Sequence, residues 1–247
     1  MVVWGINPVL EALEENPEGI ERIIIFKKAL SGKVYRILEL AKKHEIQVKI
    51  VDDPNFHPPK VPPQANTQGV VAYISEFQYA SLEDIEMSWT LSHETPLVLA
   101  LDGVSDPQNL GSIIRSAVAL FAHGIVIPKH RACEVTGTVI KASSGAAFKI
   151  PITKVTNLKH ALSYFKKLGV YVLGLTHKTE TNIFDLDLCL PLIILAGSEG
   201  SGIRPSLLKE CDFLAKIPIS PRMESLNVAQ AVAITLYEVQ RQRRFAK

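Results

Sequence analysis

Hydrophobic positions along the first third of the chain fall into short apolar runs separated by an amphipathic stretch. The runs Ile20–Phe26, Gln47–Val51 and Gly69–Ile74 are rich in β-branched residues and predict strands. Lys33–His44 places its apolar residues on one face and predicts a helix that Ser31 could cap. These elements predict a small α/β domain over residues 1–78.

From Pro96 onwards, apolar runs alternate regularly with helical patterns. The predicted strands are Leu97–Leu101, Gly124–Ile127, Ile150–Thr153, Val170–Leu175, Leu192–Ala196 and Phe213–Ile217. The predicted helices are Leu110–Leu120, Glu134–Ser143, Asn157–Leu168, Pro205–Cys211 and Asn227–Phe245. This alternation predicts an α/β fold with a mostly parallel sheet covered on both faces. Residues 96–247 are therefore expected to form a second domain, and the polar stretch 79–95 a linker.

Composition narrows the functional class. The net charge is only +2, so any nucleic-acid surface must be a local basic patch. The three cysteines are scattered, without metal-ligand spacing, and this predicts no metal site and a reducing compartment. The first residues lack a signal-peptide pattern, and no apolar run is long enough to span a bilayer. A cytoplasmic protein without membrane contact is expected.

A polar segment follows the strand predicted at Leu97–Leu101 and leads into a helix. Asn109 is a natural N-cap for that helix. Arg115 then falls among apolar residues, where an unpaired charge would be costly to bury. Two interpretations are open: an ion pair with a core carboxylate, or a guanidinium aimed at a phosphate or a ribose hydroxyl.

A glycine-rich loop, Gly197–Gly202, follows the strand predicted at Leu192–Ala196. Glu199 stands where a dinucleotide fingerprint has its second glycine, and a carboxylate there would repel a pyrophosphate. The loop suits a nucleoside ligand without phosphates and with a positive charge, such as S-adenosylmethionine. The alternative is an ordinary tight turn in which Glu199 caps the next helix.

A third segment, Ile217–Val228, leads into the last predicted helix. Ser225 or Asn227 could cap that helix. Capping would explain only one of these two polar residues. Pro218 and Pro221 stiffen the approach and fix where its backbone groups point.

The three segments, in this order and at these separations, resemble the SpoU (TrmH-like) family of RNA ribose 2′-O-methyltransferases in the SPOUT superfamily. The motifs that carry this resemblance are Asn109–Arg115, Leu195–Gly202, Ile217–Ile219 and Ser225–Val228. Gly5–Leu13 and Gln68–Ala72 are similar to the substrate-binding domain of the subgroup that methylates a guanosine of 23S ribosomal RNA, whose fold resembles an RNA-binding ribosomal protein. Thr67 departs from the histidine that many relatives have before the Gln-Gly pair.

The resemblance implies that the second domain holds a deep trefoil knot, an exception to the rule that chains are unknotted. It also implies S-adenosylmethionine as cofactor and a homodimer packed through the knotted domain, with the final helix taking part. By motif position, the implied cofactor contacts are Thr176, Gly197, Ile217 and Leu226, with Leu195 and Ile219 nearby.

The implied reaction is attack of a ribose 2′-oxygen on the cofactor's methyl group. Arginine stays protonated up to a pKa above about 12, so Arg115 is expected to stabilise the developing alkoxide, with the proton lost to water or phosphate. Asn109, Ser225 and Asn227 would position ribose and cofactor, and Glu199 would orient Arg115 or its own loop. RNA affinity would come from local basic residues: Lys27, Lys28, Lys33, Lys129, His130, Arg131 and Lys141.

Other interpretations remain open at this point. Transfer RNA is an alternative substrate, and a non-catalytic RNA-binding protein of the same fold is an alternative function. A base-directed methyltransferase of the same superfamily would carry different motifs. A nucleotide-dependent oxidoreductase is disfavoured by the lack of a glycine fingerprint.

Overall fold

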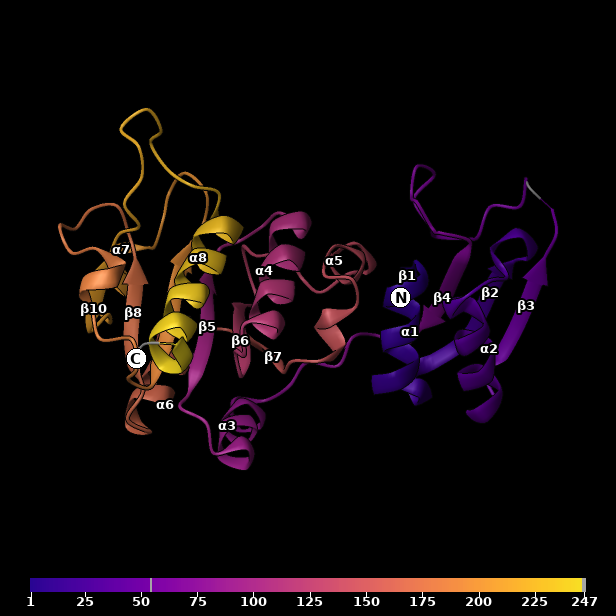
Figure 1. The fold of residues 1–247 in the computed structure, drawn as a ribbon, viewed down its shortest axis with the longest axis horizontal. Helices are drawn as coiled ribbons and strands as arrows, with labels where there is room; N and C mark the ends of the chain where they lie inside the picture. The colour runs from indigo at the N-terminus through magenta and orange to yellow at the C-terminus, as the bar shows by residue number, and fades with distance from the viewer. Residues whose placement is uncertain (54, 246–247) are drawn as a thin grey trace. The chain divides into compact units, whose positions relative to one another are not determined.

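The computed structural model describes residues 1–53 and 55–245, and their contacts divide into two compact units (Figure 1). The first unit combines Met1–Gln78 with Val135–Lys149, and the second combines Tyr79–Glu134 with Ile150–Lys247. The sequence predicted one boundary between residues 78 and 96. The contacts instead assign 79–95 to the second unit and 135–149 to the first.

The first unit is built on a four-stranded sheet with the order β1-β4-β2-β3. Its elements are β1 (Val2–Trp4), α1 (Ile6–Glu15), β2 (Ile20–Phe26), α2 (Lys33–Lys43), β3 (Gln47–Val51) and β4 (Val70–Ile74), with short 3-10 turns at Pro17–Gly19 and Lys27–Ala29. β2 and β3 are parallel, whereas β4 is antiparallel to both β1 and β2. The three strands predicted here and the helix at Lys33 are confirmed.

The two faces of this sheet bury different residues because successive side chains of a strand point to opposite sides. Ile23 and Ile25 of β2 are fully buried on one face. Ile24, Val71 and Tyr73 belong to a separate cluster on the other face, where Val61 and Phe56 from the loop between β3 and β4 also pack. The proline-rich loop therefore covers part of the sheet.

A short helix from the middle of the chain completes the first unit. α5 (Gly137–Ala142) and a 3-10 turn at Ala146–Phe148 pack with β1 and α1. A Cβ atom on Gly137 would lie 2.0 Å from the carbonyl oxygen of Val2, so only glycine allows this approach. The helix predicted at Glu134–Ser143 therefore exists in shorter form, and Thr136 caps it.

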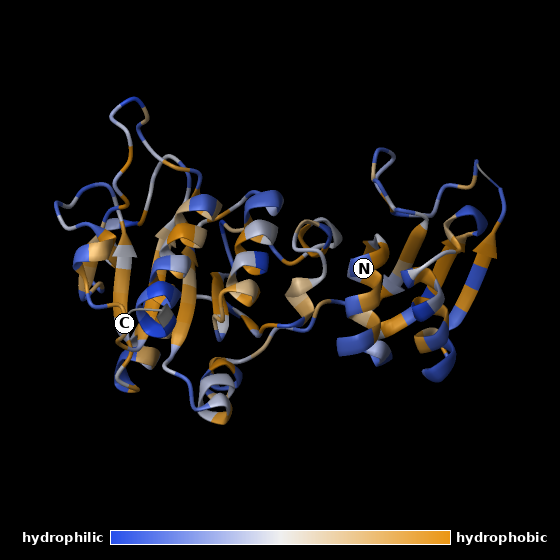
Figure 2. Cartoon of the chain, in the orientation of Figure 1, coloured by the Kyte–Doolittle hydropathy of each residue, from blue (hydrophilic) through white to orange (hydrophobic). Residues whose placement is uncertain are grey.

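The second unit contains a six-stranded sheet with the order β10-β8-β9-β5-β6-β7, in which every strand pair is parallel. Its strands are β5 (Leu97–Asp102), β6 (Gly124–Pro128), β7 (Ile152–Val155), β8 (Tyr171–Leu175), β9 (Leu192–Gly197) and β10 (Phe213–Ala215). All six residues of β5 are buried, and Figure 2 shows these strands mainly in the hydrophobic colour. This pattern is typical of parallel strands covered on both faces, and it confirms the predicted fold class.

Helices cover both faces of this sheet. They are α3 (Leu82–Ser92), α4 (Pro107–Ala119), α6 (Leu158–Lys167), α7 (Pro205–Leu208) and α8 (Val228–Gln240), with a 3-10 turn at Ile183–Asp185 and one π-helical turn at Arg241–Phe245. Residues of α3, α6 and α7 share one core cluster with Val98 and Ile193 of the sheet. α4 and α8 pack on each other, and α8 also contacts β9. The expected linker thus contributes α3, whose Trp89 is buried. The trefoil knot implied by the resemblance stays a prediction.

The arginines near the carboxyl end of the chain serve the fold. The guanidinium of Arg243 donates hydrogen bonds to the backbone oxygens of Thr95, Pro96, Leu188 and Leu190. Burial lowers the pKa of Arg243 to about 10. Arg241 pairs with Glu238, and Arg244 pairs with Glu94. Arg243 and Arg244 therefore fasten the last turns to the segments that precede β5 and β9, whereas the Arg241 pair lies within its own helix.

Candidate active site at the carboxyl edge of the parallel sheet

Three loops that carry sequence motifs leave the same edge of the six-stranded sheet. Figure 1 shows the arrowhead of β8 pointing to this edge. The register places Asp102 opposite Gly197, Gly174 opposite Leu195, and Leu175 opposite Ala215. The strands β10, β8, β9 and β5 are neighbours, so the loops that follow them lie side by side. Ligands of parallel sheets bind beyond this edge.

The residues predicted to contact the cofactor lie along this edge. Thr176 directly follows β8, and its N–H donates to the carbonyl oxygen of Ala215 (2.9 Å). Gly197 ends β9, while Ile217 lies two residues beyond β10. Leu195 is fully buried and Leu226 is half-buried, whereas Ile219 is 37% exposed.

The loop after β9 folds back on itself. Ser198 and Gly202 form a bridge, and the N–H of Gly202 donates to the carbonyl oxygen of Ser198 (2.9 Å). A Cβ atom on Gly197 would lie 2.0 Å from the carbonyl carbon of Gly202, so the returning chain requires glycine at position 197. Gly200 and Gly202 have positive φ angles of 87° and 68°. The tight turn is real, and it presents Glu199 at its tip.

Glu199, Asn109 and Asn227 form one hydrogen-bonded cluster, although each comes from a different motif. Glu199 Oε1 accepts from Asn109 Nδ2 (3.0 Å) and from Asn227 Nδ2 (2.6 Å). Asn227 Nδ2 also donates to Asn109 Oδ1 (2.9 Å). The two amides thus provide hydrogen bonds to a carboxylate that lies at the surface. Glu199 therefore ties the glycine-rich loop to the beginnings of α4 and α8.

The helix caps differ in part from the sequence prediction. Asn227 caps α8, because its Oδ1 accepts from the N–H groups of Ala229 and Gln230, while its Nδ2 remains available for the cluster. Ser225 is exposed and lies outside the cap. Asn109 was expected to cap α4, which is wrong: α4 begins at Pro107, and Asp106 caps it by accepting from the N–H of Asn109 (2.9 Å). Proline favours the first helical position, so the cap falls on Asp106, three residues before the expected one.

Arg115 lies on the exposed side of α4. The expectation that it sits within an apolar environment is therefore wrong, since Leu110, Ile114 and Ala117 form the buried side of the helix. Six residues separate it from Asn109, which corresponds to about 9 Å along the helix axis. Its guanidinium is thus presented at the surface rather than within the core.

An ion pair between the buried carboxylate of Asp102 and the half-exposed side chain of Arg204, which the sequence did not single out, holds the glycine-rich loop. Asp102, only 3% exposed, accepts from the backbone N–H of Arg204 (2.8 Å) and from its Nε (2.8 Å), and Nη2 lies 2.7 Å away. The signal available in the sequence was an aspartate that directly follows a strongly apolar strand. Its role becomes visible only when Arg204, 102 residues away, is brought to it.

Basic residues from the loop after β6 lie beside these loops. Lys129, His130 and Arg131 are exposed. Their loop runs along the one after β5: the N–H of Cys133 donates to the carbonyl oxygen of Val104 (2.9 Å). Three exposed side chains capable of positive charge therefore lie on a loop that borders the candidate site.

The two motifs of the first unit meet at the start of α1. Gln68 Oε1 accepts from the N–H of Ile6 (3.1 Å) and from Lys141 Nζ (3.2 Å). Gly5 has a φ angle of 102°, and a Cβ atom there would lie 2.4 Å from Lys141 Nζ. Gln68 thus satisfies a first-turn N–H that Gly5 has no side chain to bind. Among the other predicted RNA contacts of this unit, Lys27 pairs with Asp52 (2.6 Å).

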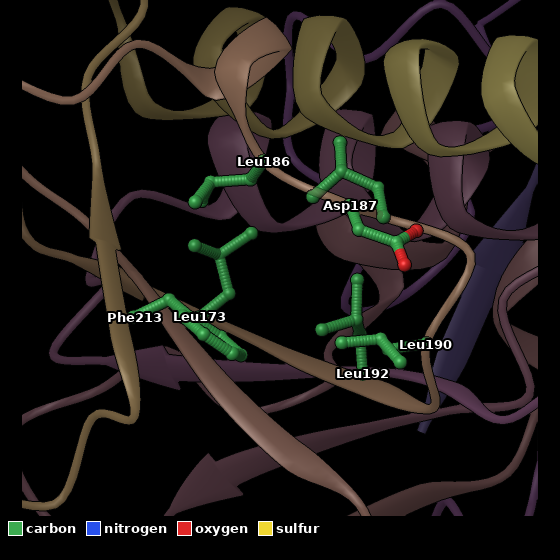
Figure 3. Close-up of a pocket in the computed structure, with 7 residues that line it drawn as sticks. Leu173, Leu186, Asp187, Leu190, Leu192 and Phe213 are labelled. Atoms are coloured by element: carbon green, nitrogen blue, oxygen red, sulfur yellow. The ribbon is translucent and has the colours of Figure 1, made fainter.

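A small apolar cavity lies elsewhere in the second unit (Figure 3). Its volume is about 80 Å³, and its lining residues are Leu173, Leu186, Asp187, Leu188, Leu190, Leu192 and Phe213. Asp187 is engaged in its own loop, where it accepts from the N–H of Cys189 (2.9 Å). Ligand pockets usually measure about 300–1,000 Å³, so this cavity is too small for a nucleoside cofactor.

Within the described parts of the chain, no group of acidic, histidine or cysteine side chains could hold a metal ion. The same residues contain no helix long and apolar enough to cross a membrane.

Comparison with known proteins places the chain in a family. Residues 96–237 match the SpoU rRNA Methylase family, and residues 2–80 match the RNA 2′-O ribose methyltransferase substrate-binding family. The chain is 38% identical to the putative TrmH family tRNA/rRNA methyltransferase YacO of Bacillus subtilis (98% of this chain, 95% of that protein). It is 37% identical to the 23S rRNA (guanosine-2′-O-)-methyltransferase RlmB of Coxiella burnetii (98% and 95%).

Solved structures agree with this assignment. The SpoU methyltransferase AviRb from Streptomyces viridochromogenes, in complex with AdoMet, superimposes with a TM-score of 0.81 at 26% identity, over 98% of this chain and 90% of that one. An AdoMet-bound rRNA methyltransferase from Sinorhizobium meliloti gives a TM-score of 0.77 at 26% identity, over 97% and 86%. The chain belongs to the SpoU family of RNA methyltransferases.

Proposed function

We propose that this protein transfers a methyl group from S-adenosylmethionine to the ribose 2′-hydroxyl of a guanosine in 23S ribosomal RNA. The observation that carries the proposal is the cluster of Glu199, Asn109 and Asn227, which joins three loops at the ligand-binding edge of a parallel sheet. The relative from Coxiella burnetii, named for this activity, aligns over 98% of the chain. The first unit would bind the RNA substrate, and residues 96–247 would carry out the transfer.

The edge fits S-adenosylmethionine better than a phosphorylated nucleotide. Glu199 lies at the tip of the glycine-rich loop, where its carboxylate disfavours a phosphate and suits a cationic sulfonium. Thr176, Gly197, Ile217 and Leu226 would hold the cofactor, with Leu195 and Ile219 beside them. Bound there, the cofactor supplies an electrophilic methyl group.

The protein's own residues would align the ribose and stabilise charge. Asn109 and Asn227 would position the ribose and cofactor together with Ser225, while Glu199 fixes both amides. Arg115 would stabilise the oxyanion that develops on the ribose, and the proton would leave to water or phosphate. Alignment alone can lower a barrier by roughly 7–11 kcal/mol in favourable cases.

A homodimer formed through the second unit would complete the enzyme. Ile234 and Tyr237 of α8 are 42% and 60% exposed, and Phe184, in a turn that contacts this helix, is 55% exposed. An apolar stripe of this kind suits a second copy of the chain. Arg115 is exposed, so it could act within its own subunit or across the dimer. We place the enzyme in the cytoplasm, where RNA is available.

The decisive experiment methylates RNA from a strain that lacks this protein, using labelled cofactor, and maps the product by mass spectrometry. A 2′-O-methylguanosine in 23S ribosomal RNA is expected. A methyl group on a base atom would overturn ribose chemistry, whereas a product in transfer RNA would favour the alternative that the name of the Bacillus relative includes.

The role of Arg115 is tested separately. Arg115→Ala should abolish turnover and leave cofactor affinity, measured by calorimetry, nearly unchanged. Near-normal methylation by that variant would refute the role.

A further inference from the structure

A cavity of about 280 Å³ lies on the sheet of the first unit, beneath the loop between β3 and β4. Its lining residues are Arg22, Ile23, Ile24, Gln47, Lys49, Phe56 and Pro59. None of the motifs discussed above contributes to it. The volume approaches that of ordinary ligand pockets and suits one small planar group.

Most strand residues of this cavity belong to two rows of cross-strand partners. Tyr73 of β4, Arg22 of β2 and Gln47 of β3 are register partners, and Val71, Ile24 and Lys49 form the next row of the same face. Alternation along each strand places the side chains of both rows on one face of the sheet. Figure 2 shows hydrophilic positions along β3, the edge strand that carries Gln47 and Lys49.

Both cations lie against aromatic rings. The guanidinium carbon of Arg22 is 4.4 Å from the centroid of the Tyr73 ring, and Lys49 Nζ is 5.4 Å from the centroid of Phe56. The Tyr73 hydroxyl donates to the carbonyl oxygen of Pro59 (3.0 Å), which ties the loop to the sheet. Two positive charges therefore lie against rings beside a partly apolar cavity.

The charged side chains that line the cavity are both positive. Among the described residues that line it, none is acidic. Lys27, by contrast, pairs with Asp52 at 2.6 Å on the same unit. Arg22, Gln47 and Lys49 are exposed, and Phe56 is half-buried. In a chain of net charge +2, a cationic mouth beside a half-buried ring has the composition of a site for one unpaired nucleotide.

We propose that this cavity binds a single unpaired nucleotide of the RNA substrate, with its base beside the Phe56 ring and its phosphate at Arg22 and Lys49. Gln47 would donate to or accept from the edge of the base. The inference rests on the proposed function in one respect, namely that the ligand is RNA. Such a site would anchor the RNA through a nucleotide other than the one that is methylated and contribute to the choice of substrate.

The test measures binding of a fluorescent single-stranded RNA of mixed sequence to the full chain at fixed salt. Arg22→Gln combined with Lys49→Gln should weaken binding by about tenfold. It should also reduce the slope of log affinity against log salt concentration by an amount that corresponds to about one to two phosphate contacts. The matched control, Lys42→Gln with Lys43→Gln, removes two exposed cations from α2 of the same unit. It should weaken binding much less. Equal losses in the two pairs would overturn the proposal, because the cavity would then act only through general charge.

Stacking is tested independently of charge. Phe56→Leu should weaken binding by about tenfold without altering the salt dependence. If that variant proves unstable in thermal unfolding, Gln47→Glu places a carboxylate at the cavity without disturbing buried packing, and it should weaken binding similarly. A duplex of the same sequence should bind the native chain and Phe56→Leu equally, since a paired base cannot enter. Unchanged single-strand binding by Gln47→Glu would contradict the proposal.

Methylation assays separate this inference from the proposed function. The cavity variants should raise the KM for RNA and leave kcat and cofactor affinity unchanged, as expected when binding is lost equally in the ground and transition states. If the native enzyme methylates RNA and the cavity variants have an unchanged KM, the proposed nucleotide site is wrong while the proposed function stands. Cavity-dependent RNA binding without methylation of any RNA would overturn the proposed function alone.

Discussion

Arg204 binds the buried carboxylate of Asp102 through both its side chain and its own backbone N–H. The contact fixes the end of β5 to the chain that leaves the glycine-rich loop. Gly197 holds the other end of this loop in the sheet, opposite Asp102 itself. Both ends of the loop that presents Glu199 are therefore anchored at Asp102 of the neighbouring strand.

Replacing Arg204 should destabilise the second unit. Arg204→Ala leaves a carboxylate that is 3% exposed with only the backbone N–H as partner, and we expect a loss of about 3 kcal/mol in the free energy of unfolding. Lys159→Ala is the matched control, because its ammonium pairs with Glu210 at 2.7 Å and is largely exposed. That change should cost about 1 kcal/mol or less. Urea unfolding followed by circular dichroism measures both, and equal losses would contradict the role of the buried pair.

Substitutions of Asn227 should separate helix capping from the cluster. Asn227→Ser keeps an oxygen that can cap α8 but loses the amide that donates to Glu199, so stability should stay near that of the native protein while methylation falls steeply. Asn227→Ala should also lose about 1 kcal/mol of stability through the missing cap. Asn157→Ala removes the equivalent cap of α6, away from the candidate site, and should leave methylation intact. Full activity of Asn227→Ser would show that the cluster is dispensable.

Stability should decrease in mild acid because of His123. The imidazole is 8% exposed and its Nδ1 accepts from the N–H of Leu97 (3.1 Å), so the neutral ring is the form that fits. Burial lowers the pKa of His123 from 6.5, and this effect outweighs the raising effect of Glu94, whose carboxylate lies 3.4 Å from Nε2. A group with a lowered pKa in the folded state contributes stability above its unfolded pKa and loses it as the pH falls through the folded pKa.

The variant His123→Asn isolates this contribution. Its side-chain oxygen can replace Nδ1 as acceptor, and it does not titrate. The free energy of unfolding should therefore fall less for the variant than for the native protein between about pH 7 and pH 5. Parallel pH profiles for the two proteins would rule out His123 as the cause.

The three cysteines should react at different rates with iodoacetamide. Burial raises the pKa of Cys211 to about 11 and also raises that of Cys133, so few thiolates are present at either position near neutral pH. Cys189 is exposed and should be alkylated first, as peptide mapping by mass spectrometry can show. In Cys189→Ser only slow modification should remain. Alkylation of Cys211 at the rate of Cys189 would be incompatible with its burial.

Local patterns predicted most elements correctly, and the differences have physical causes. The strand predicted at Ile150–Thr153 begins instead at Ile152, because Pro151 has no N–H to donate to the ladder. The strand predicted at Phe213–Ile217 ends at Ala215, since Lys216 pairs with Thr181 and Asn182 instead. The helix near Glu134 packs with β1 of the first unit. No local pattern could predict this packing, because it depends on a close approach between Gly137 and Val2, which are far apart in the sequence.

The sequence by itself determined the parallel α/β architecture, since strongly apolar strands alternating with amphipathic helices have few other ways to bury their surfaces. It also supplied three motifs with their polar side chains. Only the tertiary structure decided that Asn109, Glu199 and Asn227, separated by 90 and 28 residues, bind one another. The reason is that the strand order β10-β8-β9-β5 differs from chain order, so loops distant in sequence leave the same edge. The burial and pairing of Asp102 likewise depend on the tertiary structure, because its partner Arg204 lies on a loop that is distant in the sequence.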